Sequence, residues 1–371
     1  MQQLLLRPVI HRFETIGEFA RAFSLGGDDL IVTTESVNRN FIEPLRCGAQ
    51  VLVAKKYGKG EPNDEMAEAM YRDAKPGFKR VVAIGGGTVL DVAKLFALEN
   101  PVPVTRLYDH KDEIRRVMPL VLVPTTCGTG SEVTNISILE LKSRKTKLGL
   151  AADPLYPDAA VLIPELLGAL PYEVFATSSI DALVHAVESS VSPKATPFTK
   201  LFGHRAIEMI VRGYQAIARD GKEARLPLLG DFLLASTYAG IAFGNAGCAA
   251  VHAMSYPLGG NYHVPHGESN YALFTEVFKT YMRLDANGRI TELNRLLAGL
   301  LGCGEEQVYD ELEKLLGAIL ERKPLSAYGM TREDIDRFTD SVMTSQGRLM
   351  ANNYTTLTRE TVRSIYEALY E

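Results

Sequence analysis

The chain lacks tryptophan altogether and contains only four cysteines and seven histidines among its 371 residues. The cysteines form no CxxC pair and no short-range disulfide framework, which is typical of a reducing compartment and predicts a cytoplasmic protein. Uncharged apolar runs stay well short of the roughly 18 residues that cross a bilayer. The N-terminal stretch MQQLLLRPVIHRF has too short an apolar run for a signal-peptide core.

Blocks of basic residues are also missing. The formal net charge is −5, and the lysines and arginines are dispersed, which argues against nucleic acid or an anionic membrane surface as a partner. A hydrophobic content of 46% with 23% charged residues is typical of a soluble globular protein and excludes disorder as the main state. Because 371 residues exceed the ~250–300 at which a single core stops growing, we expect two domains.

The first half alternates short apolar runs with helical patterns. Strands are expected at 30–33, 51–53, 81–84, 120–123 and 159–163, with a hairpin at 136–141 and 146–150. Continuous apolar strands separated by helices indicate a parallel sheet that is buried on both faces. We therefore predict an α/β domain with a parallel sheet over residues 1–174.

The second half carries apolar residues at three- and four-residue intervals, without strict alternation. Helices are expected at 178–191, 198–219, 226–243, 249–256, 276–284, 290–301, 305–321, 332–343 and 359–370. Ser178, Thr331 and Thr358 are the expected N-caps of three of them. Residues 175–371 are predicted to form an all-helical domain.

Two glycine-containing loops follow predicted strands. In VVAIGGGTVLDVAK, residues Gly85, Gly86 and Gly87 stand between a strand and a helix, where free backbone N–H groups can bind a phosphate. The GxGxxG spacing is absent, so a plain tight turn is the alternative. In LVLVPTTCGTGSEVTN a second loop brings hydroxyls at Thr125, Thr126 and Thr129. Since both loops leave the carboxyl ends of parallel strands, where ligands of such sheets bind, an extended phosphate-bearing ligand is expected.

A metal site is indicated by histidine and carboxylate spacing. In SSIDALVHAVESS, Asp181 and His185 are four residues apart and share one face of a predicted helix. Two alternatives exist for this pair: Asp181 in the first turn would face the helix dipole, and His185 could be a core histidine.

The segment VHAMSYPLGGNYHVPHGES holds three of the seven histidines, His252, His263 and His266. We expect a helix carrying His252 to end at Pro257 and the two glycines, after which the chain turns and returns His266. Asp181, His185, His252 and His266 then make four ligands for Fe²⁺ or Zn²⁺, and the ligand set alone does not choose between these ions.

The motifs GGGTVLDVAK, PTTCGTGSE, IDALVHAVE and VHAMSYPLGGNYHVPHG, in this order, resemble those of the iron-containing (group III) alcohol dehydrogenase family. The resemblance implies a dehydroquinate synthase-like architecture. Residues 1–174 would form a Rossmann-like dinucleotide-binding domain that holds NAD, residues 175–371 would form a metal-binding domain that holds Fe²⁺, and the active site would lie in the cleft between them. It assigns the pyrophosphate to Gly85, Gly86, Gly87 and Asp91, and the path to the nicotinamide to Thr125, Thr126 and Thr129. Asp181, His185, His252 and His266 match the metal ligands of the family.

Two positions depart from many relatives. The second histidine that many relatives carry four residues after His252 is here Tyr256. Tyr256 and His263 are the expected proton-transfer residues, with the ribose hydroxyls of the cofactor and water as alternative proton routes. The aspartate that often follows the first strand in NAD-preferring relatives is missing, and Glu35 is expected to bind the ribose hydroxyls, unless the preference for NAD over NADP is relaxed.

Within the family, the chain is most similar to members that interconvert 4-hydroxybutyrate and succinic semialdehyde. Other small alcohols (1,3-propanediol, lactaldehyde or butanol) remain alternative substrates. A dehydroquinate synthase-like lyase is a second hypothesis, and a non-catalytic metal- or nucleotide-binding protein is a third. We expect a homo-oligomer, a dimer in the simplest case.

Overall fold

The computed structural model of the chain describes residues 2–58, 61–144 and 146–371. Two compact units are present, one formed by Leu6–Leu170 and one by Pro171–Glu371 together with residues 2–5. Leu5 joins the second unit through its backbone, which exchanges hydrogen bonds of 2.7 and 3.0 Å with the side chain of Asn245. The predicted domain ranges 1–174 and 175–371 stay a prediction; in the described chain, residues 2–5 group with the second unit.

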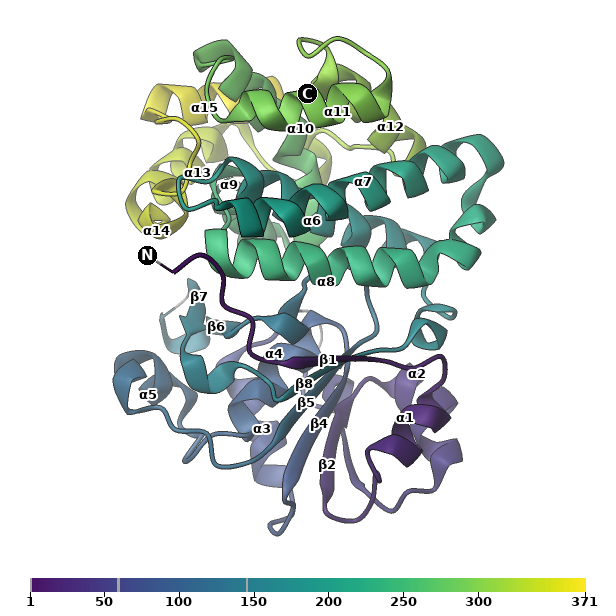
Figure 1. Cartoon of the computed structure of the whole chain (residues 1–371). Helices are drawn as coiled ribbons and strands as arrows, with labels where there is room; N and C mark the ends of the chain where they lie inside the picture. The colour runs from purple at the N-terminus through teal and green to yellow at the C-terminus, as the bar shows by residue number, and fades with distance from the viewer. Residues whose placement is uncertain (1, 59–60, 145) are drawn as a thin grey trace. The chain divides into compact units, whose positions relative to one another are not determined.

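The first unit contains a six-stranded sheet in the order β1-β8-β5-β4-β2-β3, in which every pair of neighbours is parallel. A separate antiparallel hairpin, β6-β7, confirms the predicted one. The strands are β1 Val9–Arg12, β2 Asp29–Thr33, β3 Gln50–Val53, β4 Arg80–Gly85, β5 Leu120–Pro124, β6 Ile136–Leu141, β7 Thr146–Ala151 and β8 Ala159–Leu162 (Figure 1).

Strand register decides where the glycine-containing loops emerge. β4 and β5 are hydrogen-bonded neighbours, with Gly85 opposite Pro124, so both strands end at the same edge of the sheet. On the other side of β4, Thr33 of β2 lies opposite Ile84, and its hydroxyl donates a 2.7 Å hydrogen bond to the Ile84 carbonyl. The loops that follow β2, β4 and β5 therefore share one edge of the sheet, as the parallel pattern predicts.

Helices of the first unit cover this sheet. They are α1 Ile16–Ala22, α2 Glu35–Val37, α3 Asp64–Asp73, α4 Gly87–Phe96 and α5 Val104–Asp109. Side chains from α3, α4 and α5 form one apolar core with the strands. Apolar residues fill both faces of the central strands, which is the arrangement that continuous apolar strands require. The expected α/β fold with a parallel sheet is confirmed.

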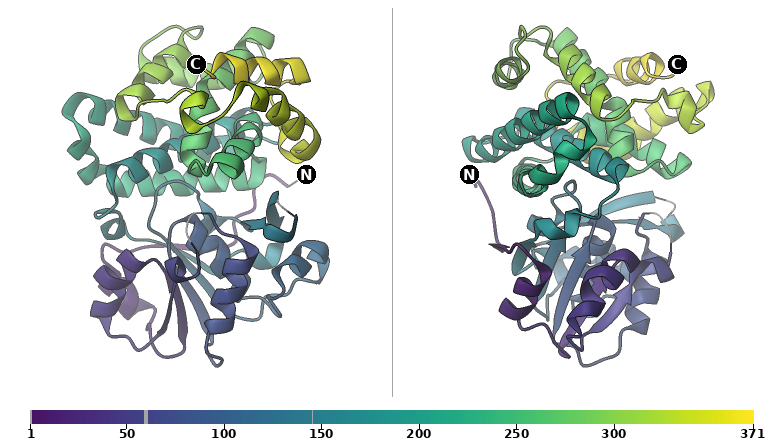
Figure 2. Two further views of the ribbon diagram at one scale, coloured as in Figure 1. Left: turned by 180° about the vertical axis from the view of Figure 1, so that it is seen from behind. Right: turned by 90° about the vertical axis from the view of Figure 1, so that its right-hand side faces the viewer.

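The second unit is helical throughout its described residues (Figure 2). Helices α6, α7 and α8 pack on one another, α10 packs on α6 and α9, and α13 packs on α9 and α15. The helices are α6 Tyr172–Val191, α7 Pro197–Asp220, α8 Leu229–Ala246, α9 Ala250–Tyr262, α10 His266–Leu284, α11 Ile290–Leu301, α12 Val308–Ile319, α13 Arg332–Ser345, α14 Gly347–Met350 and α15 Arg359–Ala368.

Two of the three predicted N-caps are confirmed. Thr331 caps α13 in a reciprocal capping box with Asp334, and the Thr358 hydroxyl accepts from the backbone N–H of Thr361 at the start of α15. Ser178 is not a cap: α6 begins at Tyr172, and the Ser178 hydroxyl donates to the Phe175 carbonyl inside the helix. A serine within a buried helix satisfies its hydroxyl this way, so its presence did not mark the helix start.

The expected helix end at Pro257 is wrong. Helix α9 continues through Pro257 to Tyr262, and the side chain of Asn261 donates to the Pro257 carbonyl at 2.8 Å. A proline inside a helix removes one backbone hydrogen bond, and burial of Pro257 and Leu258 stabilises the continued helix. His263 ends α9 with a left-handed φ of 55°, and His266 is the first residue of α10.

Within the described residues, Lys222–Ala246 is the only stretch with the length and apolar composition of a membrane-crossing helix, and part of it is buried in the protein. Its helix α8 packs against α6 and α7, and a core helix of a soluble protein has the same composition.

Candidate functional site

The two predicted phosphate-binding loops are in contact. Gly86 is the N-cap of α4, which begins at Gly87, and the backbone N–H of Thr125 donates a 3.0 Å hydrogen bond to the Gly85 carbonyl. A Cβ placed on Gly87 would lie 2.7 Å from the Thr129 Cγ2, and one on Gly86 would lie 3.3 Å from Thr126 Cγ2. The close packing of the loops requires glycine at 87, while the start of α4 provides backbone donors for an anion.

Asp91, on α4, stabilises the loop that follows β5. One of its carboxylate oxygens accepts a 2.6 Å hydrogen bond from the Ser131 hydroxyl, and the other accepts a 2.9 Å bond from the backbone N–H of Ile138. Lys94, completely buried, donates to Ser131 at 2.7 Å and to the Ile136 carbonyl at 2.6 Å. Both side chains thus connect α4 to Ser131, in the segment after β5, and to the first strand of the hairpin, β6.

Glu35 is the first residue of α2, directly beyond β2. Its exposed carboxylate accepts from the Lys55 ammonium at 3.1 Å. This hydrogen bond and the charge of Lys55, with smaller contributions from Arg39 and Lys56, hold the pKa of Glu35 below its usual value. The predicted ribose-binding carboxylate is therefore ionised and stands among cations at the same sheet edge as the glycine loop.

In the helical unit, three helices bring the four predicted metal ligands together. Asp181 and His185 come from α6, His252 from α9 and His266 from α10. One potential ligand atom from each residue lies within 4.8 Å of those of the others. The Oδ1 atom of Asp181 is 3.7 Å from the Nε2 atom of His266 and 3.9 Å from that of His252. One oxygen and three imidazoles at this separation are the donor set of a divalent transition-metal ion.

Stacking orients the His185 ring. Its centroid lies 4.2 Å from that of Phe243 and 4.6 Å from that of His252, with interplanar angles of 18° and 23°. His185 is therefore held between a phenylalanine of α8 and a second ligand histidine. His185 also has a ligand atom within 4.8 Å of a carboxylate oxygen of Asp181. A histidine that only fills the core does not require this arrangement.

The helix-dipole alternative for Asp181 is removed by the structure. Because α6 begins at Tyr172, Asp181 lies in its third turn, where the dipole of the N-terminus no longer acts. Burial by itself raises the pKa of this carboxyl, but the nearby imidazoles of His185, His266 and His252, with a hydrogen bond from Asn270, lower it to about 2. A carboxylate that stays ionised at 2% exposure requires cationic surroundings.

The side-chain amide of Asn270, on α10, faces the donor atoms of three of the four predicted ligands. Its amide nitrogen is 2.7 Å from Asp181 Oδ1, 3.1 Å from His252 Nε2 and 3.2 Å from His266 Nε2. An amide group has two hydrogens for these three atoms, and the Asn270 Oδ1 atom is buried without a hydrogen-bond partner. The convergence of lone pairs exceeds what one amide can satisfy, so the residues fit a bound cation.

Glu188 also contacts the ligand set, and the sequence interpretation missed it together with Asn270. The Glu188 carboxylate, completely buried, is 2.7 Å from His252 Nδ1. A signal was present for Glu188, because it follows Asp181 by seven positions and His185 by three, on the same helix face. For Asn270 the corresponding signal was its position one turn after His266.

The two predicted proton-transfer residues differ in placement. Tyr256 is half-buried on α9, one turn after His252, and its ring centroid is 6.2 Å from that of His266. His263 is exposed at the C-terminal end of α9, eleven positions after His252. Tyr256 is the better placed of the two.

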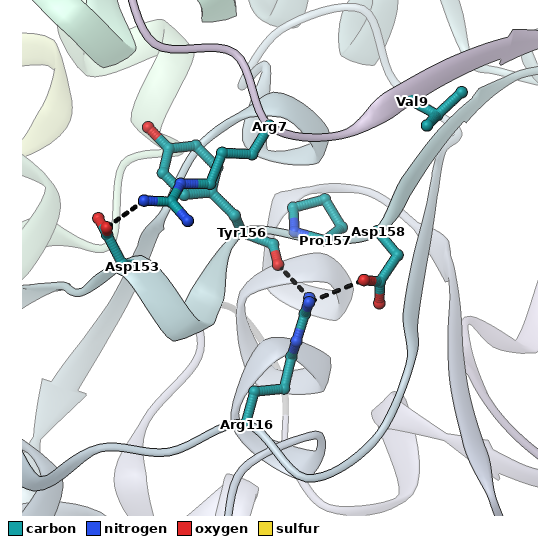
Figure 3. A pocket seen from close by; sticks show the side chains of 7 residues that line it. All are labelled: Arg7, Val9, Arg116, Asp153, Tyr156, Pro157 and Asp158. Carbon is teal, nitrogen blue, oxygen red and sulfur yellow. Dashed lines mark hydrogen bonds and ion pairs between the residues drawn. The ribbon is translucent and has the colours of Figure 1, made fainter.

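A separate surface pocket of about 530 Å³ lies in the first unit, beside β1 (Figure 3). Arg7 pairs with Asp153 at 2.5 Å and lies over the Tyr156 ring, while Arg116 pairs with Asp158 at 2.7 Å. Each guanidinium is neutralised by a carboxylate, so the pocket has no net charge with which to attract an anion.

Comparison with protein families assigns both halves of the chain. The family model described as iron-containing alcohol dehydrogenase matches residues 9–164, and the one described as the Fe-containing alcohol dehydrogenase family, C-terminal, matches residues 175–370. A 4-hydroxybutyrate dehydrogenase of Clostridium kluyveri is 48% identical over 371 residues, with 100% of both chains covered. Long-chain-alcohol dehydrogenase 1 of Geobacillus thermodenitrificans is 36% identical over 318 residues, which cover 82% of this chain and 78% of the relative.

Solved structures support the fold. The sulfoacetaldehyde reductase of Bifidobacterium kashiwanohense, in complex with NAD+, superimposes with a TM-score of 0.86 at 22% identity, covering 100% of this chain and 99% of the other. A 1,3-propanediol oxidoreductase gives a TM-score of 0.81 at 21% identity, with 100% of both chains covered.

Proposed function

The chain belongs to the iron-containing alcohol dehydrogenase family, and on that premise we propose that it is a metal-dependent, NAD(H)-linked dehydrogenase that interconverts 4-hydroxybutyrate and succinic semialdehyde. The observation that carries the substrate assignment is the 48% identity, over the whole of both chains, to a 4-hydroxybutyrate dehydrogenase.

Asp181, His185, His252 and His266 are proposed to hold Fe²⁺, with Zn²⁺ as the alternative ion. Support comes from the convergence of their donor atoms within 4.8 Å and from the amide nitrogen of Asn270, which faces three of these donor atoms at 2.7 to 3.2 Å. With a divalent ion bound, the carboxylate of Asp181 would lower its net charge, and the neutral imidazoles of the three histidines would leave a positive charge to polarise a substrate oxygen.

The cofactor residues are proposed to be Gly85, Gly86 and Gly87 at the start of α4, with Thr125, Thr126 and Thr129 on the adjoining loop and Glu35 beyond β2. Support comes from the contact of the two loops and their common sheet edge. Asp91 is proposed to act on this site through Ser131 and Ile138, whose donors occupy both of its carboxylate oxygens.

When bound, the metal ion supplies Lewis acidity and the nicotinamide exchanges the hydride. Oxidation of a primary alcohol also releases one proton, which passes to a protein group, a ribose hydroxyl of the cofactor or water. We assign the first proton-transfer position to the hydroxyl of Tyr256, which would accept this proton while passing its own proton to water, because its ring lies beside His266. His263 stays the alternative.

The test is an anaerobic assay of Fe²⁺-loaded protein with succinic semialdehyde, propanal and lactaldehyde, using NADH and NADPH separately. Succinic semialdehyde with NADH is expected to give the highest kcat/KM. Preference for an uncharged aldehyde would contradict the substrate assignment, while absence of net NADH consumption with every aldehyde would favour the lyase or the non-catalytic alternative. His266→Ala should lose bound metal and most turnover.

A cytoplasmic homodimer is the proposed working form. Strand β1 is the last strand at one edge of the six-stranded sheet, and its Val9 and Ile10 side chains are exposed by 59% and 38%. An exposed apolar edge strand can pair with another chain. Light scattering coupled to gel filtration should give twice the 40.7 kDa chain mass; a monomer would contradict this proposal.

A further inference from the structure

We infer that Glu188 is a positioning residue that determines which ring nitrogen of His252 carries the proton and which one faces the metal ion. The inference rests on the proposed function, because it requires an ion held by His252 and its three companions. Glu188 supplies no atom to that four-residue set and acts through His252.

The three donors bound by Glu188 all come from the start of α9. Its Oε2 atom accepts from the backbone N–H of Ala249 at 3.0 Å and lies 2.7 Å from His252 Nδ1, and its Oε1 atom accepts from the N–H of Val251 at 2.6 Å. Burying an ionised carboxylate is costly unless such donors compensate it. Here two backbone N–H groups and the positive end of a helix dipole do so.

Glu188 also replaces a missing cap. The N-cap residue of α9 is Ala249, which has no side-chain hydrogen bond to offer, and the carboxylate from α6 satisfies these helix-start groups in its place. Helix α6, which carries Asp181 and His185, is thereby connected to the helix that carries His252. One carboxylate couples the start of α9 to the orientation of its ligand histidine.

The contact with Glu188 determines which ring nitrogen of His252 carries the proton. An ionised carboxylate only accepts hydrogen bonds, so Nδ1 of His252 must carry the proton that it donates to Glu188. In the neutral ring this leaves a lone pair on Nε2, the nitrogen that faces Asp181 Oδ1 at 3.9 Å and Asn270 at 3.1 Å. A metal-ligating histidine typically has its second nitrogen held in this way.

The thiol of Cys248 lies next to the same ring but does not provide the same restraint. A cysteine sulfur is a weak hydrogen-bond acceptor, so the carboxylate of Glu188 is the stronger partner for the ring. The Cys248 carbonyl accepts a 3.1 Å hydrogen bond from the side chain of Asn352. Asn352 therefore supports the same helix start without contacting His252, which makes Asn352→Ala a matched control.

The test compares Zn²⁺ affinity and ring protonation. Glu188→Gln keeps the side-chain shape but brings an amide donor toward Nδ1, and the Zn²⁺ dissociation constant, measured by chelator competition, should rise about 10- to 100-fold. Glu188→Asp, which keeps the carboxylate, should restore part of the affinity. Asn352→Ala should lower the unfolding temperature while the Zn²⁺ dissociation constant stays within about threefold of the wild-type value.

The spectroscopic readout uses Zn²⁺-loaded protein labelled with ¹⁵N-histidine. The wild type should show a protonated Nδ1 at His252, assigned by its absence from His252→Gln, and Glu188→Gln should lose this signal. Wild-type affinity with an unchanged signal in Glu188→Gln would overturn the inference and leave Glu188 as a helix cap only. If Glu188→Gln does not fold, an unprotonated Nδ1 in the wild type would overturn it equally. Wild-type protein that binds no divalent metal would instead overturn the proposed function.

Discussion

Asn270 of α10 donates a 2.7 Å hydrogen bond to Asp181 of α6, across 89 positions of the chain. This contact holds the only carboxylate of the ligand set in the orientation that faces His252 and His266. Asn270→Ala should therefore weaken Zn²⁺ or Fe²⁺ binding about 10- to 100-fold, as measured by chelator competition.

A matched control for this change is Asn294→Ala. Asn294 is equally buried in the same unit, but its side chain accepts from the Tyr309 hydroxyl and touches no ligand. We expect it to lower the unfolding temperature without changing metal affinity. Equal losses of affinity in the two variants would mean that Asn270 contributes only to general packing.

Tyr256 should carry the proton that leaves the substrate alcohol. Its ring lies 6.2 Å from the His266 ring, so Tyr256→Phe removes the hydroxyl and leaves the packing. The expected result is a fall in kcat of about 100-fold, the lower end for general acid–base catalysis, with metal content unchanged. His263→Gln is the comparison, and a larger fall in kcat for this exposed residue would reverse the assignment.

Gly87 should be required for the cofactor loop because a Cβ there overlaps Thr129 Cγ2 at 2.7 Å. Gly87→Ala is expected to cost about 1–3 kcal/mol through overpacking and to raise the KM for NADH. Thr129→Ser lacks the overlapping methyl group, so the double variant should recover much of the loss. No recovery in the double variant would place the effect of Gly87→Ala outside this contact.

Glu35 should influence the choice between NADH and NADPH. Its carboxylate is paired with the Lys55 ammonium at 3.1 Å. When this carboxylate is removed, the ammonium is available to bind the 2′-phosphate of NADPH. Glu35→Ala should lower the ratio of kcat/KM for NADH to that for NADPH about fivefold. Lys55→Ala should move the ratio in the opposite direction; an unchanged ratio in both variants would show that these residues do not reach the ribose.

The titration of Lys94 should make the free energy of unfolding of the first unit rise with pH in the alkaline range. Burial lowers its pKa to about 8, against the opposing charges of Asp91 and Glu132, from 10.5 in the unfolded chain. Between these values the folded state binds fewer protons than the unfolded state, so stability rises with pH.

Lys94→Met removes this titration. The free energy of unfolding of the wild type, minus that of Lys94→Met, should therefore increase from pH 8 to pH 10.5 in urea denaturation series. A difference that stays flat or falls across this range would contradict the lowered pKa of Lys94.

Local pattern was sufficient for much of the fold and of the candidate site. Continuous apolar runs predicted the parallel strands, because a sheet covered on both faces excludes polar residues. The four-residue spacing of Asp181 and His185 placed both on one helix face, because the helical period is a property of the backbone. Thr331 and Thr358 marked helix starts because a cap bonds within its own turn.

Tertiary structure decided the features that depend on distant segments. Burial carries α9 through Pro257, and the six extra residues at the start of α6 move Asp181 away from the helix dipole. Glu188 meets His252 across 64 positions of the chain. No local period encodes such a contact, since it depends on how α6, α9 and α10 pack. The sequence by itself determined which side chains have the chemistry to bind a metal; packing decided which of their atoms face one another, because orientation inside a protein is set by neighbours from other parts of the chain.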